Sequence, residues 1–213
     1  RRSRRRRSKV SACGILQQSK IPVVVIGGGK EEQGFDTVAI DNYQGAFSAT
    51  EYLIRKKGFK KIAHITGPQE NDDAFLRKKG FLDACKKYDV TVKKTFMIDG
   101  DFTRDSGYNG FIKLYGSSHK PEAIFAANDM MALGCYDAAS YLNVRIPDDI
   151  ALVGFDDIFV SQYLSPGLTT VRVQIEEVGR AAAKILVDKL NGINGKQHPL
   201  VKISTELIIR SSC

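Results

Sequence analysis

The chain has 213 residues, 43% of them hydrophobic, so it is long enough to bury one substantial core or two small lobes, and wholesale disorder is excluded. Its formal net charge of +8 is concentrated at one end, because residues 1–9 hold seven of the 32 Lys and Arg residues and no acid. The other 25 basic and 24 acidic residues leave the rest of the chain nearly neutral, which argues against a nucleic-acid-binding surface there.

Six arginines open the sequence, at positions 1, 2, 4, 5, 6 and 7. An arginine cluster can bind phosphates, and it fits equally a solvated, disordered end or non-native sequence. We favour a disordered or non-native segment over residues 1–19, since isolated charge blocks at chain ends are usually unstructured. No long apolar stretch follows, which predicts neither a signal peptide nor a membrane span, and we expect a cytoplasmic protein.

Between residues 21 and 155, short apolar runs alternate with longer segments of helical period. This alternation is typical of a parallel β-sheet covered by helices. The short runs predict strands at residues 21–26, 37–40, 61–66, 95–98, 123–127 and 150–155. The longer segments predict helices at residues 42–57, 72–88, 104–115 and 129–142. Asp41 or Asn42 can cap the first helix, and the second is expected to bury Phe81, Leu82 and Cys85.

The order of elements changes after residue 169. A strand at 170–173 precedes a long helix and two extended segments near 201–203 and 206–209. The helix carries an apolar stripe at helical spacing, made of Ile175, Val178, Ala182, Ile185 and Leu186. Such a tail is able to cross back between two lobes.

A glycine run at residues 27–29, followed by Lys30, invites comparison with phosphate-binding loops. The Walker motif requires Ser or Thr after the lysine, where this sequence has Glu31. The dinucleotide-binding fingerprint requires a third glycine where Glu32 stands, and a new strand begins by Thr37, too soon for the required helix. We therefore interpret the run as a flexible loop.

Polar side chains follow several predicted strands, where open α/β sheets bind their ligands. Asn128 follows the strand at 123–127, Asp156 follows the strand at 150–155, and Arg77 lies about one turn inside the helix that follows the strand at 61–66. A carboxylate, an amide and a guanidinium together can discriminate the hydroxyl groups of a polyol. The alternative is that Asn128 only caps a helix and Asp156 only starts a turn.

Three further side chains lie near these strand ends in the sequence. Phe102 can offer an aromatic face to a sugar or purine ring, or it can plug a hinge. Asp72, at the start of its predicted helix, is included in the predicted effector site, whereas Asp129 is expected to be structural.

Catalysis finds little support in the sequence. His64 lies inside a predicted strand, where a lone histidine is usually a core residue, and His119 and His198 have no metal-ligand spacing. No G-x-S-x-G nucleophile motif is present. The four cysteines stand far apart, which favours reduced thiols over a disulfide framework or a zinc site. We expect neither an enzyme nor a metal or cofactor site.

Several segments in order carry a family resemblance: VAIDNYQGAFSAT (38–50), IRKKGFKKIAHITG (54–67), RKKGF (77–81), AIFAANDMMALG (123–134), IPDDIALVGFDD (146–157), LTTVRVQIEEVG (168–179) and TELIIRSS (205–212). With them the chain from about Ile21 to Arg210 resembles the effector-binding domain of the LacI/GalR family of bacterial transcriptional repressors. The AANDMMALG stretch alone also fits periplasmic sugar-binding proteins, whereas the combination of the 146–157 and 168–179 segments is specific to the repressors and to regulators that share their sensor.

The resemblance implies ligand contacts from Arg77, Asn128 and Asp156, with Phe102 at an aromatic position of the pocket. Three positions depart from the family pattern. Phe59 stands where His is common, Gly27 where many members carry Asp, and Val173 where some carry a ligand-contacting Gln. The last two departures leave the identity of the ligand open.

The resemblance also implies parts that are not recognisable before Ile21: a helix-turn-helix head, a hinge helix and the first βαβα of the sensor. We therefore expect a chain truncated at its N-terminus that does not read DNA sequence by itself. The first lobe would be incomplete, with an unpaired apolar edge.

The expected fold is a two-lobed α/β sensor of the type I periplasmic-binding-protein-like class, with parallel sheets flanked by helices. The expected divisions are a partial N-terminal lobe at 20–98, a C-terminal lobe at 99–171, and a crossover helix with terminal strands at 172–213.

The expected function is sensing of a sugar-like effector, with allosteric control of operator binding through the absent head, in a homodimer without membrane contact. Two alternatives remain. A sugar-binding protein of a transport system would have a signal peptide encoded upstream in place of a helix-turn-helix, and a cytosolic sugar enzyme would turn its sugar over.

Overall fold

The computed structural model describes residues 16, 21–27, 34–193 and 200–213. The arginine cluster and most of the glycine run lie outside the described residues. The strands are β1 (Val24–Ile26), β2 (Asp36–Ile40), β3 (Ile62–Ile65), β4 (Met97–Ile98), β5 (Ala123–Ala126), β6 (Ala151–Asp156), β7 (Thr169–Val173), β8 (Leu200–Ile203) and β9 (Thr205–Ile208). The helices are α2 (Asn42–Arg55), α3 (Asp72–Lys87), α4 (Arg104–Tyr115), α5 (Asp129–Tyr141) and α6 (Ile175–Leu190), with short 3-10 turns at Lys94–Phe96 and Phe159–Gln162.

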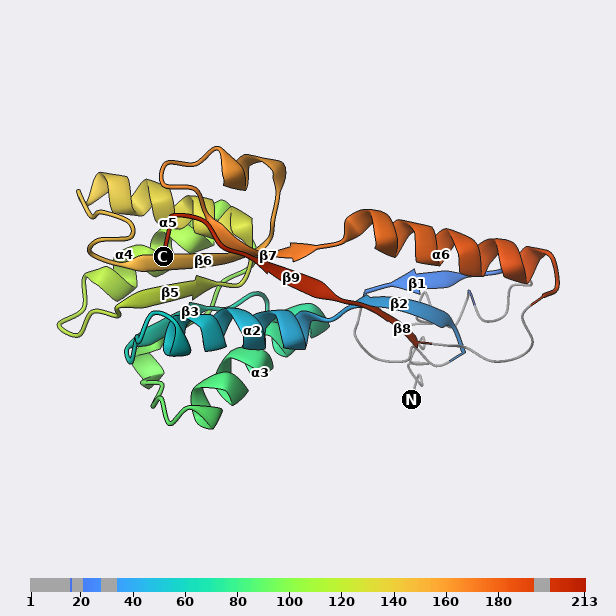
Figure 1. The fold of residues 1–213 in the computed structure, drawn as a ribbon, viewed down its shortest axis with the longest axis horizontal. Helices are drawn as coiled ribbons and strands as arrows, with labels where there is room; N and C mark the ends of the chain where they lie inside the picture. Colours follow the sequence, from blue (N-terminus) through green and yellow to red (C-terminus); the bar gives the residue numbers. More distant parts are fainter. Residues whose placement is uncertain (1–15, 17–20, 28–33, 194–199) are drawn as a thin grey trace, which may run out of the picture.

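Six strands form the large sheet, in the order β4-β3-β5-β6-β7-β9. All neighbouring pairs are parallel except β7 and β9. Helices α2 and α3 cover one face and α4 and α5 the other (Figure 1). Each face has its own apolar cluster, one centred on Phe111 and Ile124, the other on Phe81 and Phe125. The strands are therefore apolar on both faces, which explains their continuous apolar runs.

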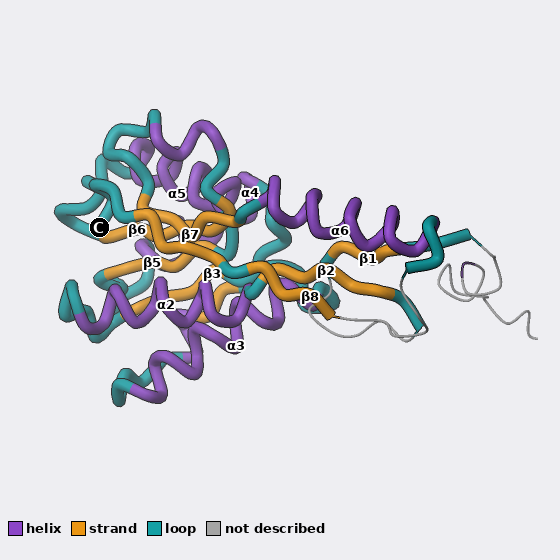
Figure 2. The backbone as a smooth tube through the Cα atoms, turned by 45° about the vertical axis from the view of Figure 1, so that its right-hand side comes forward, coloured by secondary structure: helices purple, strands orange, loops and turns teal. Residues whose placement is uncertain are grey.

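Three parallel strands form the small sheet, in the order β1-β2-β8, and α6 packs beside it (Figure 2). The apolar stripe of α6 buries Val178, Ala182 and Ile185 against Val38 of β2. Ile175, at the start of the same stripe, is exposed. Within the described residues β1 is an edge strand, and its Ile26 is exposed.

The boundary between the two sheets does not coincide with the lobe boundary expected between residues 98 and 99. Strands β3 and β4 belong to the same sheet as β5 and β6, so the division falls between β2 and β3. The reason is α2, whose buried Ala46 and Leu53 pack with Phe81 of α3 on the large sheet. Helical periodicity predicts that α2 has a buried face but does not say which sheet that face covers.

The tail of the chain connects the two sheets. Strand β8 pairs with β2 in the small sheet, and β9, which begins two residues later, pairs antiparallel with β7 in the large sheet. Figure 1 shows β8 and β9 as one nearly continuous path between the sheets.

Local differences from the predicted elements are small. Phe81 and Cys85 of α3 are buried as expected, together with Ala84, whereas Leu82, also expected to be buried, is 38% exposed. The strand expected at 95–98 begins with a 3-10 turn and is reduced to two residues. Asp41, rather than Asn42, caps α2. Among the described residues, no helix is both long enough and apolar enough to cross a membrane.

Candidate functional site

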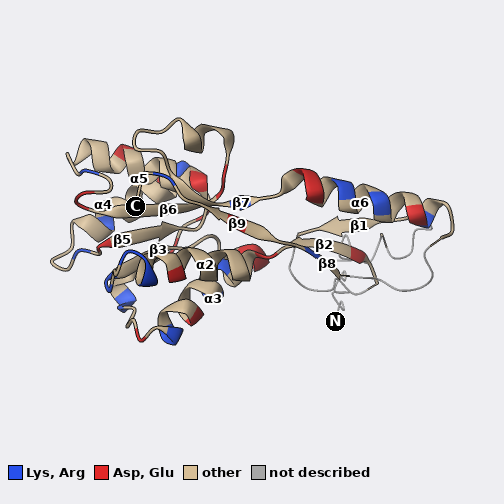
Figure 3. Ribbon diagram, in the orientation of Figure 1, with Lys and Arg blue, Asp and Glu red and all other residues tan. Residues whose placement is uncertain are grey.

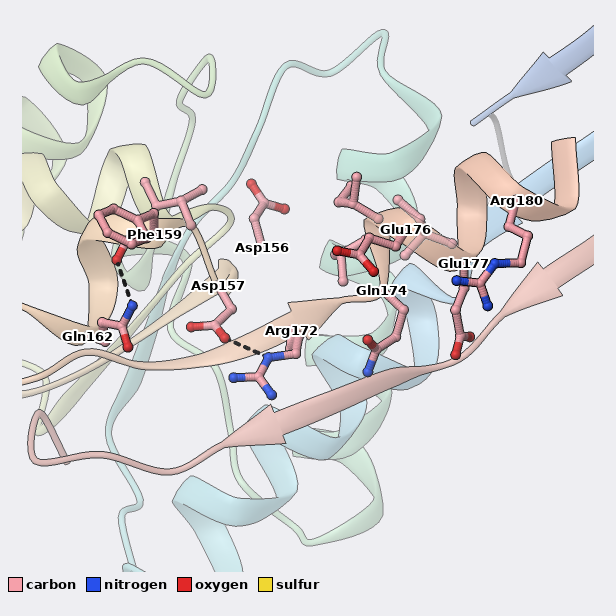
Figure 4. A pocket seen from close by; sticks show the side chains of 13 residues that line it. Asp156, Asp157, Phe159, Gln162, Arg172, Gln174, Glu176, Glu177 and Arg180 are labelled. Carbon is pink, nitrogen blue, oxygen red and sulfur yellow. Dashed lines mark hydrogen bonds and ion pairs between the residues drawn. The ribbon is translucent and has the colours of Figure 1, made fainter. Parts of the chain in front are cut away.

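The carboxyl ends of strands from both sheets meet at one cavity of about 1010 Å³. Ile40 at the end of β2, Asp156 at the end of β6 and Val173 at the end of β7 all line it. The turn that begins at Phe159 and the first turn of α6 form the remaining walls, as Figure 4 shows. This is the position at which parallel α/β sheets bind ligands.

Arg77 lies behind this cavity and is almost completely buried. Its Nε donates to Oδ1 of Asn42 at 2.7 Å, and its Nη1 donates to the carbonyl oxygen of Ala127 at 2.7 Å. The same Nη1 lies 3.2 Å from Oδ1 of Asp156. Burial lowers the pKa of the guanidinium, and the charge of Asp156 opposes that shift.

Aromatic rings complete the surroundings of the guanidinium. Its central carbon lies 3.8 Å from the ring centroid of Phe155 and 5.6 Å from that of Phe102. Cation–π attraction and the ion pair together compensate a charge that would otherwise be costly to bury. Arg77 is therefore held in one position by contacts from four separate segments of the chain.

Asp156 ends β6 with φ at 110°, a backbone conformation that few non-glycine residues adopt. Its side chain is 32% exposed, so one part contacts Arg77 while another faces the cavity. Burial raises the pKa of Asp156, and Arg77 acts in the opposite direction. A carboxylate in this position can accept hydrogen bonds from ligand hydroxyl groups.

Both the oxygen and the nitrogen of the Asn128 side-chain amide form hydrogen bonds within the protein. Its Oδ1 accepts from the backbone N–H of Met131 at 2.9 Å, which caps α5, and its Nδ2 donates to the carbonyl oxygen of Phe102 at 3.1 Å. The capping role considered from the sequence is thus present. The same bonds bring Asn128 and Phe102 together beside Arg77.

Phe102 has φ at 69°, and its ring packs against Gly67. A Cβ atom at Gly67 would lie 2.4 Å from that ring, so only glycine allows this close approach. The ring fills space beside Arg77 and is half-buried.

Asp72 is the first residue of α3 and is half-buried. The neighbouring Asp73, not Asp72, accepts from Nδ2 of Asn42 at 3.0 Å. Asn42 therefore links Asp73 to Arg77, a role that sequence reasoning missed. Its position two residues after the end of β2 indicated only a helix cap, because the contact with Arg77 spans 35 residues of sequence.

Two other aspartates near the site are structural. Asp129 is fully buried and accepts from Ser161, Thr170 and the backbone N–H of Ile158. Burial raises its pKa to about 6, although these bonds act in the opposite direction. The expectation that Asp129 is structural agrees with this geometry. Asp157 accepts from Arg172 at 2.7 Å and from Arg210 at 2.8 Å.

His64, the histidine predicted to lie inside a strand, is not part of the candidate site. His64 is buried in β3, stacked between Phe81 and Phe125, with Nδ1 2.8 Å from the carbonyl oxygen of Phe125. It is the core histidine that its strand position indicated. No cluster of three metal-ligating side chains occurs within residues 34–193 or the other described segments.

Comparison with known proteins gives consistent matches. The family of periplasmic binding protein-like domains matches residues 50–213. The HTH-type transcriptional repressor PurR of Klebsiella pneumoniae is 36% identical over 205 residues, which cover 95% of this chain and 59% of the repressor. The chain thus spans about three fifths of the length of the curated relatives it matches.

Solved structures agree with these matches. A complex of the transcriptional regulator CelR with cellobiose superposes with a TM-score of 0.83 and is 33% identical, over 89% of this chain and 58% of CelR. A LacI family transcriptional regulator from Enterococcus faecium with bound ribose has a TM-score of 0.84 and 27% identity, over 95% of this chain and 75% of that regulator.

Proposed function

Since this chain belongs to the periplasmic binding protein-like domain family, in the form found as the effector-binding domain of LacI-family regulators, we propose that it senses a sugar-like effector for a transcription regulator. The observation that carries the proposal is the convergence of Arg77, Asp156 and Asn128 where strands of the large sheet end, beside the cavity that the two sheets share. These residues come from three separate segments, and one of them, Asp156, lines the cavity.

The proposed recognition uses hydroxyl groups. The free oxygen of Asp156 would accept hydrogen bonds from the effector, while Arg77 holds that carboxylate in place from behind. Phe102 would supply an apolar ring face close by. We include Asp72 in the proposed site because it lies at the start of the helix that carries Arg77.

The proposed signal is a change in the arrangement of the two sheets. The cavity has walls from both, so an effector that fills it favours one relative position over another. In the whole regulator that preference would change operator binding through a DNA-binding head outside this chain, in a homodimer located in the cytoplasm.

The test is ligand-induced thermal stabilisation of the chain with a panel of sugars. We expect at least one sugar to raise Tm, because a ligand that binds only the folded state stabilises it by mass action. Asp156→Ala should abolish that rise. Asp137→Asn is the matched control, since it also removes an aspartate paired with an arginine, Arg104, but on an exposed surface.

Two results would contradict the proposal. An unchanged rise of Tm in Asp156→Ala would remove Asp156 from the site. Conversion of the bound sugar into a product would indicate an enzyme in place of a sensor.

A further inference from the structure

The cavity between the sheets is lined by more acidic than basic side chains. Its carboxylates are Asp156, Asp157, Glu176 and Glu177, and its guanidinium groups are Arg172 and Arg180. In Figure 4, Glu176, Glu177 and Arg180 lie on the first turns of α6, across the cavity from Asp156 and Asp157. The charge that an effector meets depends on which of these groups are already paired.

Most of the positive charge at the cavity is already compensated. Arg172 donates to Asp157 at 2.7 Å and lies 3.9 Å from Glu206, and Arg210 also pairs with Asp157 at 2.8 Å, so two cations face two carboxylates. Arg77, behind the cavity, is paired with Asp156, and Asp73 and Asp129 also act on it electrostatically. Arg180 is the cation of the cavity lining that has no ion pair among the described residues.

The two glutamates at the start of α6, in contrast, are not paired with any arginine that the structure describes. Glu176 and Glu177 occupy its first turn and form no ion pair with any described residue. They contribute two negative charges against the single charge of Arg180. An anion entering the cavity would meet these two carboxylates on the α6 side, whereas Asp156 on the other side is paired with Arg77.

The helix itself acts in the opposite direction. The N-terminus of α6 carries a partial positive charge of about one half, which attracts anions. The Gln174 side chain makes no capping bond, so it does not occupy the first-turn N–H groups. The two glutamates outweigh that partial charge, because each carries a full negative charge in the same turn.

We propose that this cavity takes an uncharged sugar or polyol and rejects sugar phosphates and sugar acids. The proposal rests on the proposed sensing function and names the class of effector. Hydroxyl groups can donate hydrogen bonds to Asp156, Glu176 and Glu177, whereas the negative charge of a phosphate or carboxylate is repelled by Glu176 and Glu177.

The test compares matched ligand pairs by isothermal titration calorimetry on the full chain. Glucose is paired with glucose 6-phosphate, and ribose with ribose 5-phosphate. We expect the neutral member of a binding pair to have a Kd lower by about tenfold or more, and the difference to shrink as NaCl is added. Equal or tighter binding of the phosphate overturns this inference and leaves the sensing function standing. Absence of binding by both pairs and by every sugar of the thermal-stabilisation panel overturns the sensing function and the inference with it.

A variant that lacks the two negative charges of α6 tests whether this helix causes the preference for neutral over phosphorylated sugars. In Glu176→Gln/Glu177→Gln the ratio of the two Kd values should fall by about threefold or more, since both negative charges of the first turn are lost. Asp188→Asn is the control, because it removes a charge from the same helix about 16 Å further along, beyond the Debye length at physiological salt. The ratio should be unchanged there. A ratio that stays constant in the double variant contradicts the role given to these glutamates.

Discussion

Arg77 determines how the candidate site is held together at the scale of single residues. It contacts Asn42 at the start of α2, Ala127 just after β5 and Asp156 at the end of β6, which are three separate segments of the chain. A lysine would not reproduce these contacts, because they use the planar, forked donors of a guanidinium and its stacking on Phe155. The position of Asp156 in the cavity therefore depends on residues that do not line the cavity themselves.

His64 makes the stability of the fold depend on pH. Burial lowers its pKa to about 4, from the usual 6.5, and its Nε2 has no hydrogen-bond partner in the described structure. As the pH falls, His64 is protonated in the unfolded chain near pH 6.5 but in the folded chain only near pH 4. Neutral His64 therefore contributes fully to the free energy of unfolding above pH 6.5, and this contribution is lost as the pH falls toward 4. The loss amounts to about 3 kcal/mol in the free energy of unfolding.

Urea unfolding at pH 7 and at pH 4 measures this effect. The free-energy difference between the wild type and His64→Phe should change by about that amount between the two pH values. The comparison with the variant is necessary because Asp129, with its raised pKa, acts in the opposite direction: the folded state takes up its proton below about pH 6. A pH-independent difference between the two proteins would contradict the burial of a neutral His64.

At the scale of elements, α4 and α5 approach each other at glycines. A Cβ atom on Gly134 would lie 1.9 Å from the carbonyl oxygen of Arg104, and one on Gly107 would lie 2.0 Å from that of Met131. Backbone atoms cannot move aside as a flexible side chain can. The two helices are therefore packed at a separation that only glycine permits.

Gly134→Ala should lower the free energy of unfolding by about 2 kcal/mol or more, because the two helices must separate. Gly179→Ala is the matched control, since it lies in α6 with no atom within 4 Å of the added Cβ. That change should be neutral or should stabilise the protein by up to about 1 kcal/mol, as alanine favours helix over glycine. Urea denaturation of both variants measures the difference. Equal effects of the two substitutions would contradict the close packing of α4 and α5.

At the scale of the whole molecule, the two sheets have unequal cores. The large sheet is covered on both faces, whereas in the described part of the chain the small sheet has one cluster of four buried apolar residues, Val38, Val178, Ala182 and Ile185. Figure 3 shows positions of Lys, Arg, Asp and Glu along the ribbon of α6, and the residues that this helix buries are apolar. Fewer buried contacts predict a lower local stability for the small sheet.

Hydrogen exchange measured by mass spectrometry tests this difference. Amides of β2 and β8 should exchange about tenfold faster, or more, than those of β5 and β6. A tenfold ratio corresponds to a free energy of local opening that is about 1.4 kcal/mol lower in the small sheet. Slowing of exchange in β2 and β8 on addition of a binding sugar would agree with a cavity shared between the sheets. Equal protection of both sheets in the free protein would mean that they unfold as one unit.

Much of this architecture follows from local sequence patterns. The alternation of apolar runs and helical segments predicted every strand of the large sheet up to β7, although β4 is shorter than expected. The strands predicted at 123–127 and 150–155 led to the prediction that Asn128 and Asp156 lie at the carboxyl ends of strands, and they do lie at the ends of β5 and β6. These features depend on residues close in sequence, whose periodicity and capping have direct structural meaning.

The tertiary structure alone decided the rest. The sequence does not show that α2 covers the large sheet, that Asn42 joins Arg77 to Asp73, or that Arg210 reaches Asp157. Each of these contacts joins residues far apart along the chain, and each was chosen by the way whole faces pack together. Periodicity reports that a face is buried or that a strand ends, but the partner of that face or strand end is set only when distant segments meet.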